Sequence, residues 1–418
     1  MHWFTALFLA AVMISLVTRV WLARRHIRHV GAHRSSVPAD FADSISLEAH
    51  QRAADYTTEK TRLGILETFV SIALLLALTL GGGLARISGS WSEWFDAGGL
   101  AQGVALILSV AFITGLVDLP FSLYRTFGIE ARYGFNRMTW RLYLIDAIKG
   151  LVLGAVVGIP LLLLILWLMA KAGGLWWLYV WIVWAVFNLA MLAIYPTVIA
   201  PLFNKFSPLE DESLRSRIEQ LLHRCGFLAR GVFVMDGSKR SSHGNAYFTG
   251  FGASKRIVFF DTLIARLTPA EIEAVLAHEL GHFKLKHIAK RIAWLFAASL
   301  GFLALLGFLS AQPWFYSALG VSPPSTAAAL LLFFLVLPAF TFLLAPLGSL
   351  YSRRHEYEAD AYAARQANGG DLVRALVKLY QDNASTLTPD PLHSAFYDSH
   401  PPAALRIARL QAATRANA

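Results

Sequence analysis

The chain has 418 residues, of which 56% are hydrophobic and only 15% are Asp, Glu, Lys or Arg. This composition and a mean hydropathy of +0.51 exclude an ordinary soluble globular protein and indicate an integral membrane protein. The net charge of +10 raises the alternative of nucleic-acid binding, but the basic residues are scattered along loops beside apolar segments and form no nucleic-acid-binding motif. The single cysteine, Cys225, excludes intramolecular disulfides and is expected to be an ordinary buried residue.

Seven apolar stretches are long enough to cross a bilayer as helices. They are Trp3–Leu22, Leu63–Leu84, Leu100–Leu123, Ala147–Met169, Leu175–Ala200, Ile292–Leu309 and Ala327–Leu350. The first has no basic segment before it and no small-residue cleavage site, so we expect a retained anchor. Residues 1–200 are therefore expected to form a membrane domain with five spans, followed by a second domain, 201–418, with the other two.

The distribution of basic residues orients these spans. The loops Ile87–Gly98 and Gln312–Ser325 contain no Lys or Arg, and only Arg86 and Lys171 depart from the pattern. Because basic loops stay on the cytoplasmic side, we expect the N-terminus outside and the C-terminus inside. The basic loops follow the first and third spans: Arg24, Arg25, Arg28, Arg34, Arg52, Lys60 and Arg62, then Arg125, Arg132, Arg137 and Arg141.

A polar segment runs from Pro201 to the sixth span. Its pattern predicts a helix over Glu212–His223 and strands over Val232–Met235, Ala246–Phe248 and Ile257–Phe260. The segment then enters a second helix, for which Thr268 is the expected N-cap, with proline at the next position and Glu271 completing a capping box.

This second helix carries the sequence HELGH over residues 278–282, an HExxH motif. Residues i and i+4 project from one helical face, so His278 and His282 can hold one Zn²⁺ while Glu279 lies beside the attacking water. The motif indicates a zinc hydrolase that cleaves amide bonds. The alternative is an ordinary polar pair of histidines, since short motifs also occur by chance.

A catalytic zinc ion needs a third protein ligand. Glu356 and Asp360 are i and i+4 on a predicted helix over Ser352–Gln366, whereas Glu358 points away from Glu356. We assign Glu356 as the ligand and Asp360 as an acceptor that orients a ligand histidine, the alternative being a solvated charge cluster. Two spans separate Glu356 from HELGH and return the chain to the same side of the membrane.

Other histidines and the polar residues of the spans receive weaker assignments. His287 and His355 are expected to be solvated or interfacial residues that point away from the metal. Asp118 and Asn188, within spans, should face the interior, where helix packing is an equally good explanation. Helices are also expected over Asp371–Tyr380 and, after a loop, in a short basic segment near the C-terminus.

The pattern of HELGH, two spans and the EYEAD run at Glu356–Asp360 resembles the type I CAAX prenyl proteases, integral-membrane zinc metalloproteases of the gluzincin class. The similarity covers nearly the whole chain. It extends to Gly128–Asn136, Tyr195–Phe206, Ser238–Gly250 and the run from His400 to Arg406.

The resemblance implies a mainly α fold, in which about seven transmembrane helices enclose a water-filled chamber, with a cytosolic α+β insert that contains a small β-sheet. It implies one Zn²⁺ per chain, and it implies that Asp360 orients His278. His400 and Arg406 would face the substrate, and one of them would stabilise the oxyanion; from the residues alone they could equally be a loop histidine and a surface charge. An edge strand that pairs with substrate backbone would comprise Asn245, Ala246, Tyr247 and Phe248.

The expected function is therefore zinc-dependent hydrolysis of a peptide bond near the C-terminus of a prenylated or hydrophobic protein. The alternatives are a broad membrane quality-control protease and a non-enzymatic membrane scaffold. Partners are the peptide or protein substrate and the lipid bilayer. The preference for arginine over lysine and the absence of an ER retrieval signal favour a bacterial cytoplasmic membrane, with the ER membrane as alternative and the active site facing the cytosol.

Overall fold

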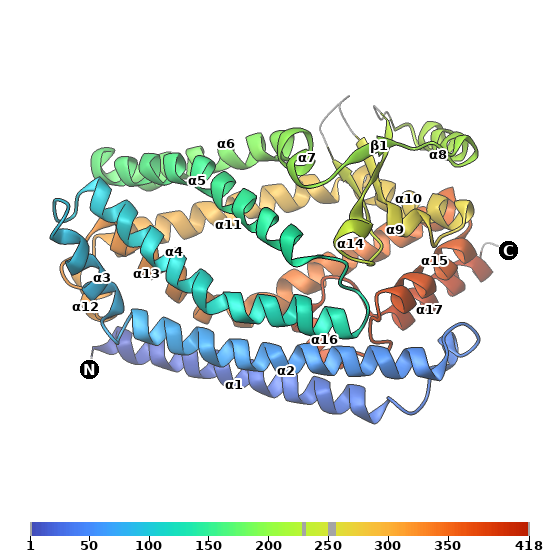
Figure 1. Cartoon of the computed structure of the whole chain (residues 1–418), viewed down its shortest axis with the longest axis horizontal. Coiled ribbons are helices and arrows are strands. Elements are labelled where there is room, and N and C mark those ends of the chain that lie inside the picture. Colours follow the sequence, from blue (N-terminus) through green and yellow to red (C-terminus); the bar gives the residue numbers. More distant parts are fainter. Residues whose placement is uncertain (1, 228–230, 250–255, 417–418) are drawn as a thin grey trace.

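A computed structural model describes residues 2–227, 231–249 and 256–416 of the chain. Long helices run side by side along the longest dimension, and a small sheet lies near one end (Figure 1). The short helices α3 (Gly83–Ser92) and α12 (Pro313–Ser317) lie at the end opposite the sheet (Figure 1).

Seven helical segments within the described residues are long and apolar enough to cross a membrane, as predicted. Their helices are α1 (Trp3–Ala32), α2 (Leu47–Leu78), α4 (Leu100–Leu123), α5 (Trp140–Lys171), α6 (Trp176–Ile194), α11 (His287–Ser310) and the pair α13 (Thr326–Thr341) and α14 (Ala345–Gln366). Several extend well beyond the apolar stretch that predicts them. Polar helix ends therefore project past the apolar region, and Arg25 of α1 donates to Asp390 of the C-terminal segment at 2.8 Å.

The last span is not one regular helix. The 3-10 turn Phe342–Leu344 separates α13 from α14 and begins four residues after Pro338, which lacks a backbone donor. As a result α14 begins inside the predicted seventh span, at Ala345, and carries Glu356.

The polar segment forms a four-stranded sheet in the order β1-β2-β4-β3. Three strands are close to prediction: β2 (Val232–Met235), β3 (Ala246–Thr249) and β4 (Arg256–Phe260). The first, β1 (Phe206–Pro208), was not predicted because three residues are too short for a recognisable alternation. β2 and β4 are parallel, and β3 is antiparallel to β4 at an edge.

One face of the sheet packs on two helices, α8 (Glu212–Arg224) and α10 (Pro269–Lys284). Ile257 and Phe259 of β4 are fully buried there together with Ile218 of α8 and Leu276 of α10. Three further helices complete this end of the molecule: α15 (Gly369–Asp382), α16 (Pro391–Tyr397) and α17 (Ala403–Ala416).

The membrane spans enclose polar side chains as well as an apolar core. Arg19, Glu67 and Asp118 line a cavity of about 420 Å³ among α1, α2, α4 and α13. Asp118 is exposed on the wall of this cavity, so its predicted interior position stays a prediction. Asn188 instead donates to the carbonyl of Trp184 in its own helix at 2.7 Å, which agrees with a role in helix structure.

Candidate active site

The start of α10 is fixed by the predicted capping box. The Thr268 hydroxyl accepts from the Glu271 amide, and the Glu271 carboxylate accepts from the Thr268 amide at 2.8 Å. Lys378 of α15 donates to the same carboxylate at 2.7 Å. These contacts join the helix that carries HELGH to the helix that follows α14.

Close packing of α10 on α14 brings the predicted metal ligands together. A Cβ at Gly281 would lie 3.0 Å from Ala359 Cα and 3.2 Å from its carbonyl oxygen, so only glycine permits this approach. Gly281 is part of HELGH, and Ala359 directly precedes Asp360. The contact between Gly281 and Ala359 therefore fixes how closely α10 and α14 approach and which residues of the two helices face each other.

His278, His282 and Glu356 converge as predicted. The two Nε2 atoms are 3.2 Å apart, and the Glu356 carboxylate oxygens lie 3.4 Å from His278 Nε2 and 3.3 Å from His282 Nε2. One ligand atom from each residue lies within 4.8 Å of the others.

The surroundings of the three residues fit a bound cation. Glu356 Oε2 is buried and has no hydrogen-bond partner among the described residues. Burial alone would lower the pKa of His278, but the carboxylates of Asp360 and Glu356 raise it to about 9. Two imidazole nitrogens and one carboxylate are the donor set of a catalytic zinc site with an open position.

A carboxylate and an arginine lie behind the first ligand. His278 Nδ1 is 2.8 Å from Asp360 Oδ1, so the imidazole donates to this carboxylate through the nitrogen remote from the cluster. Arg406 donates to both Asp360 oxygens, at 2.8 and 2.6 Å. Its side chain is only 7% exposed, and Nη1 lies 3.8 Å from Glu356 Oε2. Arg406 is therefore anchored behind the ligands.

His400 has different surroundings. Its side chain is 63% exposed, and Nε2 lies 3.5 Å from Glu356 Oε1. It also lines a cavity of about 630 Å³ between the C-terminal segment and α2. His400 and Arg406 are the two C-terminal residues predicted to face the substrate. Of these, His400 has the exposed side chain.

Glu279 lies on α10 next to His278 and is half-buried. Burial raises the pKa of its carboxyl above the ordinary value, while His278 and His282 oppose the shift. Within the described part of the chain, no group is hydrogen-bonded to this carboxylate. It is free to accept a proton.

The predictions that His287 and His355 are solvated or interfacial are wrong. Both side chains are 2% exposed, and their rings stack with centroids 4.0 Å apart. His287 Nδ1 lies 3.0 Å from His282 Nδ1, so His287 is a neighbour of the site. The sequence placed it off the metal-facing side of α10, but it belongs to α11, whose first residue it is, after a turn at Lys286 with φ 59°.

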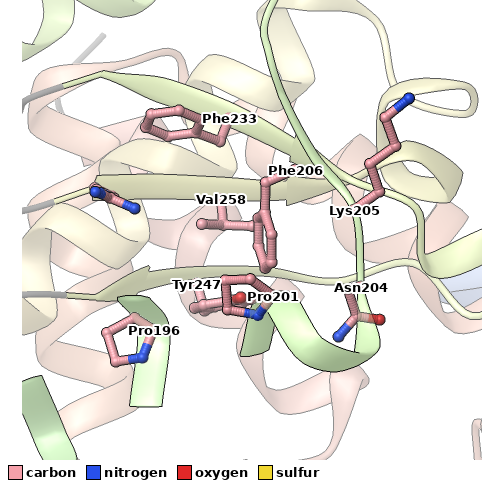
Figure 2. A pocket seen from close by; sticks show the side chains of 9 residues that line it. Pro196, Pro201, Asn204, Lys205, Phe206, Phe233, Tyr247 and Val258 are labelled. Atoms are coloured by element: carbon pink, nitrogen blue, oxygen red, sulfur yellow. The ribbon is translucent and has the colours of Figure 1, made fainter. Parts of the chain in front are cut away.

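The residues of the predicted edge strand lie at the edge of the sheet. Ala246 and Phe248 pack toward α10 and its core, whereas Tyr247 points to the opposite face. There Tyr247 lines a pocket of about 300 Å³ together with Phe206, Phe233 and Val258 (Figure 2). Since the side chains of β3 are directed to the two faces, its backbone is what remains available at the edge.

Comparisons with known proteins agree with this architecture. Residues 26–205 match the CAAX prenyl protease N-terminal model, described as five membrane helices, and residues 208–414 match peptidase family M48. The CAAX prenyl protease 1 homolog of Arabidopsis thaliana is 36% identical, over 89% of this chain and 89% of that protein. The chain belongs to the CAAX prenyl protease family.

Further members of the CAAX prenyl protease family support the assignment. CAAX prenyl protease 1 of Saccharomyces cerevisiae is 39% identical, over 74% of this chain and 72% of its own. The crystal structure of S. mikatae Ste24p matches with a TM-score of 0.90 at 33% identity, covering 98% of this chain and 99% of that one. The chain is thus a multi-pass membrane metalloprotease, with peptide or protein substrates and a metal cofactor that is typically zinc in this family.

Proposed function

We propose that this protease uses one zinc ion, held by His278, His282 and Glu356, to hydrolyse a peptide bond near the C-terminus of prenylated CAAX-type proteins. The observation that carries the proposal is the convergence of these three residues beside Glu279 and an exposed sheet edge. The relatives named CAAX prenyl protease 1 supply the substrate class. The two family matches support a division into a membrane domain, 1–200, and a metallopeptidase domain, 201–418.

The remaining residues have separate roles. When bound, zinc would polarise the scissile carbonyl and acidify the attacking water. Glu279 takes the water proton and passes it to the leaving nitrogen, for which a carboxyl pKa raised above its ordinary value is suitable. His400 donates to the developing oxyanion. Asp360, itself held by Arg406, keeps His278 in the tautomer that leaves Nε2 free for the metal.

The substrate backbone pairs with β3 along Asn245–Phe248. This strand is at the edge of the sheet, and it packs on the helix that carries HELGH. An added antiparallel or parallel strand would receive the backbone hydrogen bonds that an edge strand leaves open. Pairing fixes the register of the peptide, so that one bond is presented to Glu279.

The positive-inside pattern supports an active site that faces the cytosol. The arginine-rich composition favours a bacterial cytoplasmic membrane over the ER membrane. In such a membrane, hydrophobic protein tails in general are the substrates to compare with prenylated ones.

The test is cleavage of a farnesylated CAAX peptide and of its unprenylated twin by the purified, zinc-quantified protein. We expect one zinc per chain, zinc-dependent release of the C-terminal tripeptide and a strong preference for the farnesylated peptide. Cleavage at many bonds without this preference would replace the proposal with a quality-control protease.

Glu279→Gln is the matching variant in the same assay. It should keep its zinc and lose about 10²–10⁴-fold in kcat, because the amide cannot accept the water proton. Glu212→Gln, on an exposed carboxylate of α8, should leave both zinc content and kcat unchanged. Wild-type turnover by the Glu279 variant would disprove its role as the base.

A further inference from the structure

A second pair of buried residues lies behind the other ligand histidine. His287 Nδ1 is 3.0 Å from His282 Nδ1, and His287 Nε2 is 3.0 Å from Glu358 Oε2. The three side chains come from three helices, α10, α11 and α14. They form an unbroken line of contacts that starts at the ligand cluster and ends at a carboxylate.

Only one arrangement of protons satisfies this line with neutral imidazoles. Since His282 Nε2 faces Glu356 and the cluster, it must be without a proton to act as a ligand. Its Nδ1 then carries the proton and donates to His287 Nδ1. His287 in turn carries its proton on Nε2 and donates to the Glu358 carboxylate.

We propose that His287 and Glu358 are positioning residues that fix the tautomer and ring orientation of His282, and so raise zinc affinity and kcat. The inference rests on the zinc role proposed above for His282. An acceptor behind a ligand imidazole raises its basicity and restricts its rotation, and loss of such a partner typically costs about 10–100-fold in metal affinity or activity.

The arrangement parallels the one behind His278. There Asp360 accepts directly from His278 Nδ1 at 2.8 Å. Behind His282, the corresponding carboxylate is that of Glu358, and His287 lies between the two. Both ligand imidazoles are thus tied to a carboxylate of α14, on the same helix as Glu356.

His287, His355 and Glu358 also present three ligand atoms within 4.8 Å, which raises the alternative of a second metal site. The rings of His287 and His355 are parallel within 7°, so their lone pairs run side by side and do not converge on one point. Both nitrogens of His287 are already in hydrogen-bond contact, and Glu358 Oε1 accepts from Arg354 at 2.9 Å. The geometry therefore favours positioning over metal binding.

The stacked pair supplies a matched test, His287→Phe against His355→Phe. Both histidines are 2% exposed and lie in the same stack, but of the two only the His287 ring is in hydrogen-bond contact with a proposed ligand histidine among the described contacts. Zinc affinity is measured by competition with a chelator, without substrate, and the absorption spectrum of the Co²⁺-substituted protein reports ligand geometry. Steady-state assays at saturating zinc then separate kcat from KM.

We expect His287→Phe to bind zinc about 10–100-fold more weakly, with an altered Co²⁺ spectrum, a lower kcat and little change in KM. His355→Phe should match the wild type in zinc affinity, Co²⁺ spectrum, kcat and KM. His287→Gln, whose amide can both accept and donate, should recover most of the affinity. Equal losses in both Phe variants would mean that packing alone matters, and would overturn the inference.

Two further measurements cover the case in which His287→Phe does not fold. Glu358→Leu keeps His287 and removes its acceptor, so it should lower zinc affinity in the same direction. Arg354→Gln removes only the exposed ion pair to Glu358 and should leave zinc affinity unchanged. An unchanged affinity in Glu358→Leu contradicts the inference, as does a stoichiometry of two zinc ions in the wild type. If the wild type binds no zinc, the proposed function itself fails.

Discussion

His400 and Arg406 lie six positions apart in the sequence and have opposite surroundings. The His400 side chain is 63% exposed at a cavity, whereas that of Arg406 is 7% exposed and bound to Asp360 through two hydrogen bonds. An arginine held this firmly cannot turn toward a substrate without leaving the buried Asp360 carboxylate without its arginine partner. We therefore propose that Arg406 acts through the position of Asp360.

His400→Ala is therefore the variant that isolates the oxyanion contribution. We expect kcat to fall by about 10²–10³-fold, because one donor to the developing oxyanion is lost. Zinc content and thermal stability should not change, since the side chain is mostly exposed. His223→Ala on α8 is the control for an exposed histidine. A raised KM with unchanged kcat would assign His400 to substrate binding instead.

At the scale of residues, the sequence predicted that three candidate ligands lie together and that Asp360 lies beside one of them, but it missed His287. His278, His282 and Glu356 follow from a helical repeat that is visible in the chain. His287 could not be found in this way, because a two-residue turn, Leu285 and Lys286, separates α10 from α11 and removes the helical phase on which the prediction relied. The short turn between HELGH and a following apolar stretch was the available signal.

The approach of α10 to α14 is the contact between elements on which the site depends. In Gly281→Ala the new Cβ would meet Ala359 Cα at 3.0 Å, so the two helices must separate. We expect a loss of about 1–3 kcal/mol of stability and a fall in zinc affinity. Gly301→Ala in α11 is the control, because a Cβ there meets nothing within 4 Å. It should change neither stability nor zinc affinity. Unchanged zinc affinity in Gly281→Ala would show that the ligands tolerate helix separation.

The docking of α16 on α1 gives the protein a pH-dependent contact. Burial, followed by the charge of His26, lowers the pKa of His393 from 6.5 to about 3. Its ring stacks on His26 with centroids 4.0 Å apart. Because the folded state resists protonation of His393, this contribution to stability is complete above pH 6.5 and is lost as the pH falls from there toward about 3.

Thermal unfolding of the zinc-loaded protein at pH 7 and pH 5 measures this effect. The wild type should lose more in Tm between the two values than His393→Phe, which keeps a stacking ring but has no site for the proton. Comparing the two proteins removes the effect of the zinc ligands, which titrate equally in both. Parallel pH profiles would contradict the assignment.

The elements themselves were largely predictable, with two instructive exceptions. The long apolar stretch Leu100–Leu123 and the strand pattern of Val232–Met235 predicted α4 and β2 at their observed bounds. The break between α13 and α14 was not predicted, because Phe342–Leu344 is as apolar as the helices on either side. Hydropathy reports whether a residue can enter the membrane and not whether its backbone is helical.

At the scale of the whole molecule, the sequence predicted membrane topology from the number of membrane spans. An even number of spans between His282 and Glu356 required both ligands to lie on one side, and the structure brings them together. The absolute orientation can be measured on a Cys225→Ser background with single cysteines placed at Trp94 and Glu212, whose side chains are exposed near opposite ends of the chain's fold.

A membrane-impermeant maleimide added to intact cells should label the cysteine at position 94 only. The cysteine at position 212 should react after the membrane is permeabilised, because the active-site end is expected in the cytosol. Labelling of position 212 in intact cells would reverse the orientation and place the protease on the other side.

The helix that carries Arg406, α17, follows α10 and α14 in the chain, and this has a consequence for biosynthesis. Translation proceeds from the N-terminus, so the HELGH helix is made well before its partners on α14, and Arg406 emerges after both. The two hydrogen bonds between Arg406 and Asp360 can therefore form only after all seven membrane-spanning segments of the described chain have been synthesised.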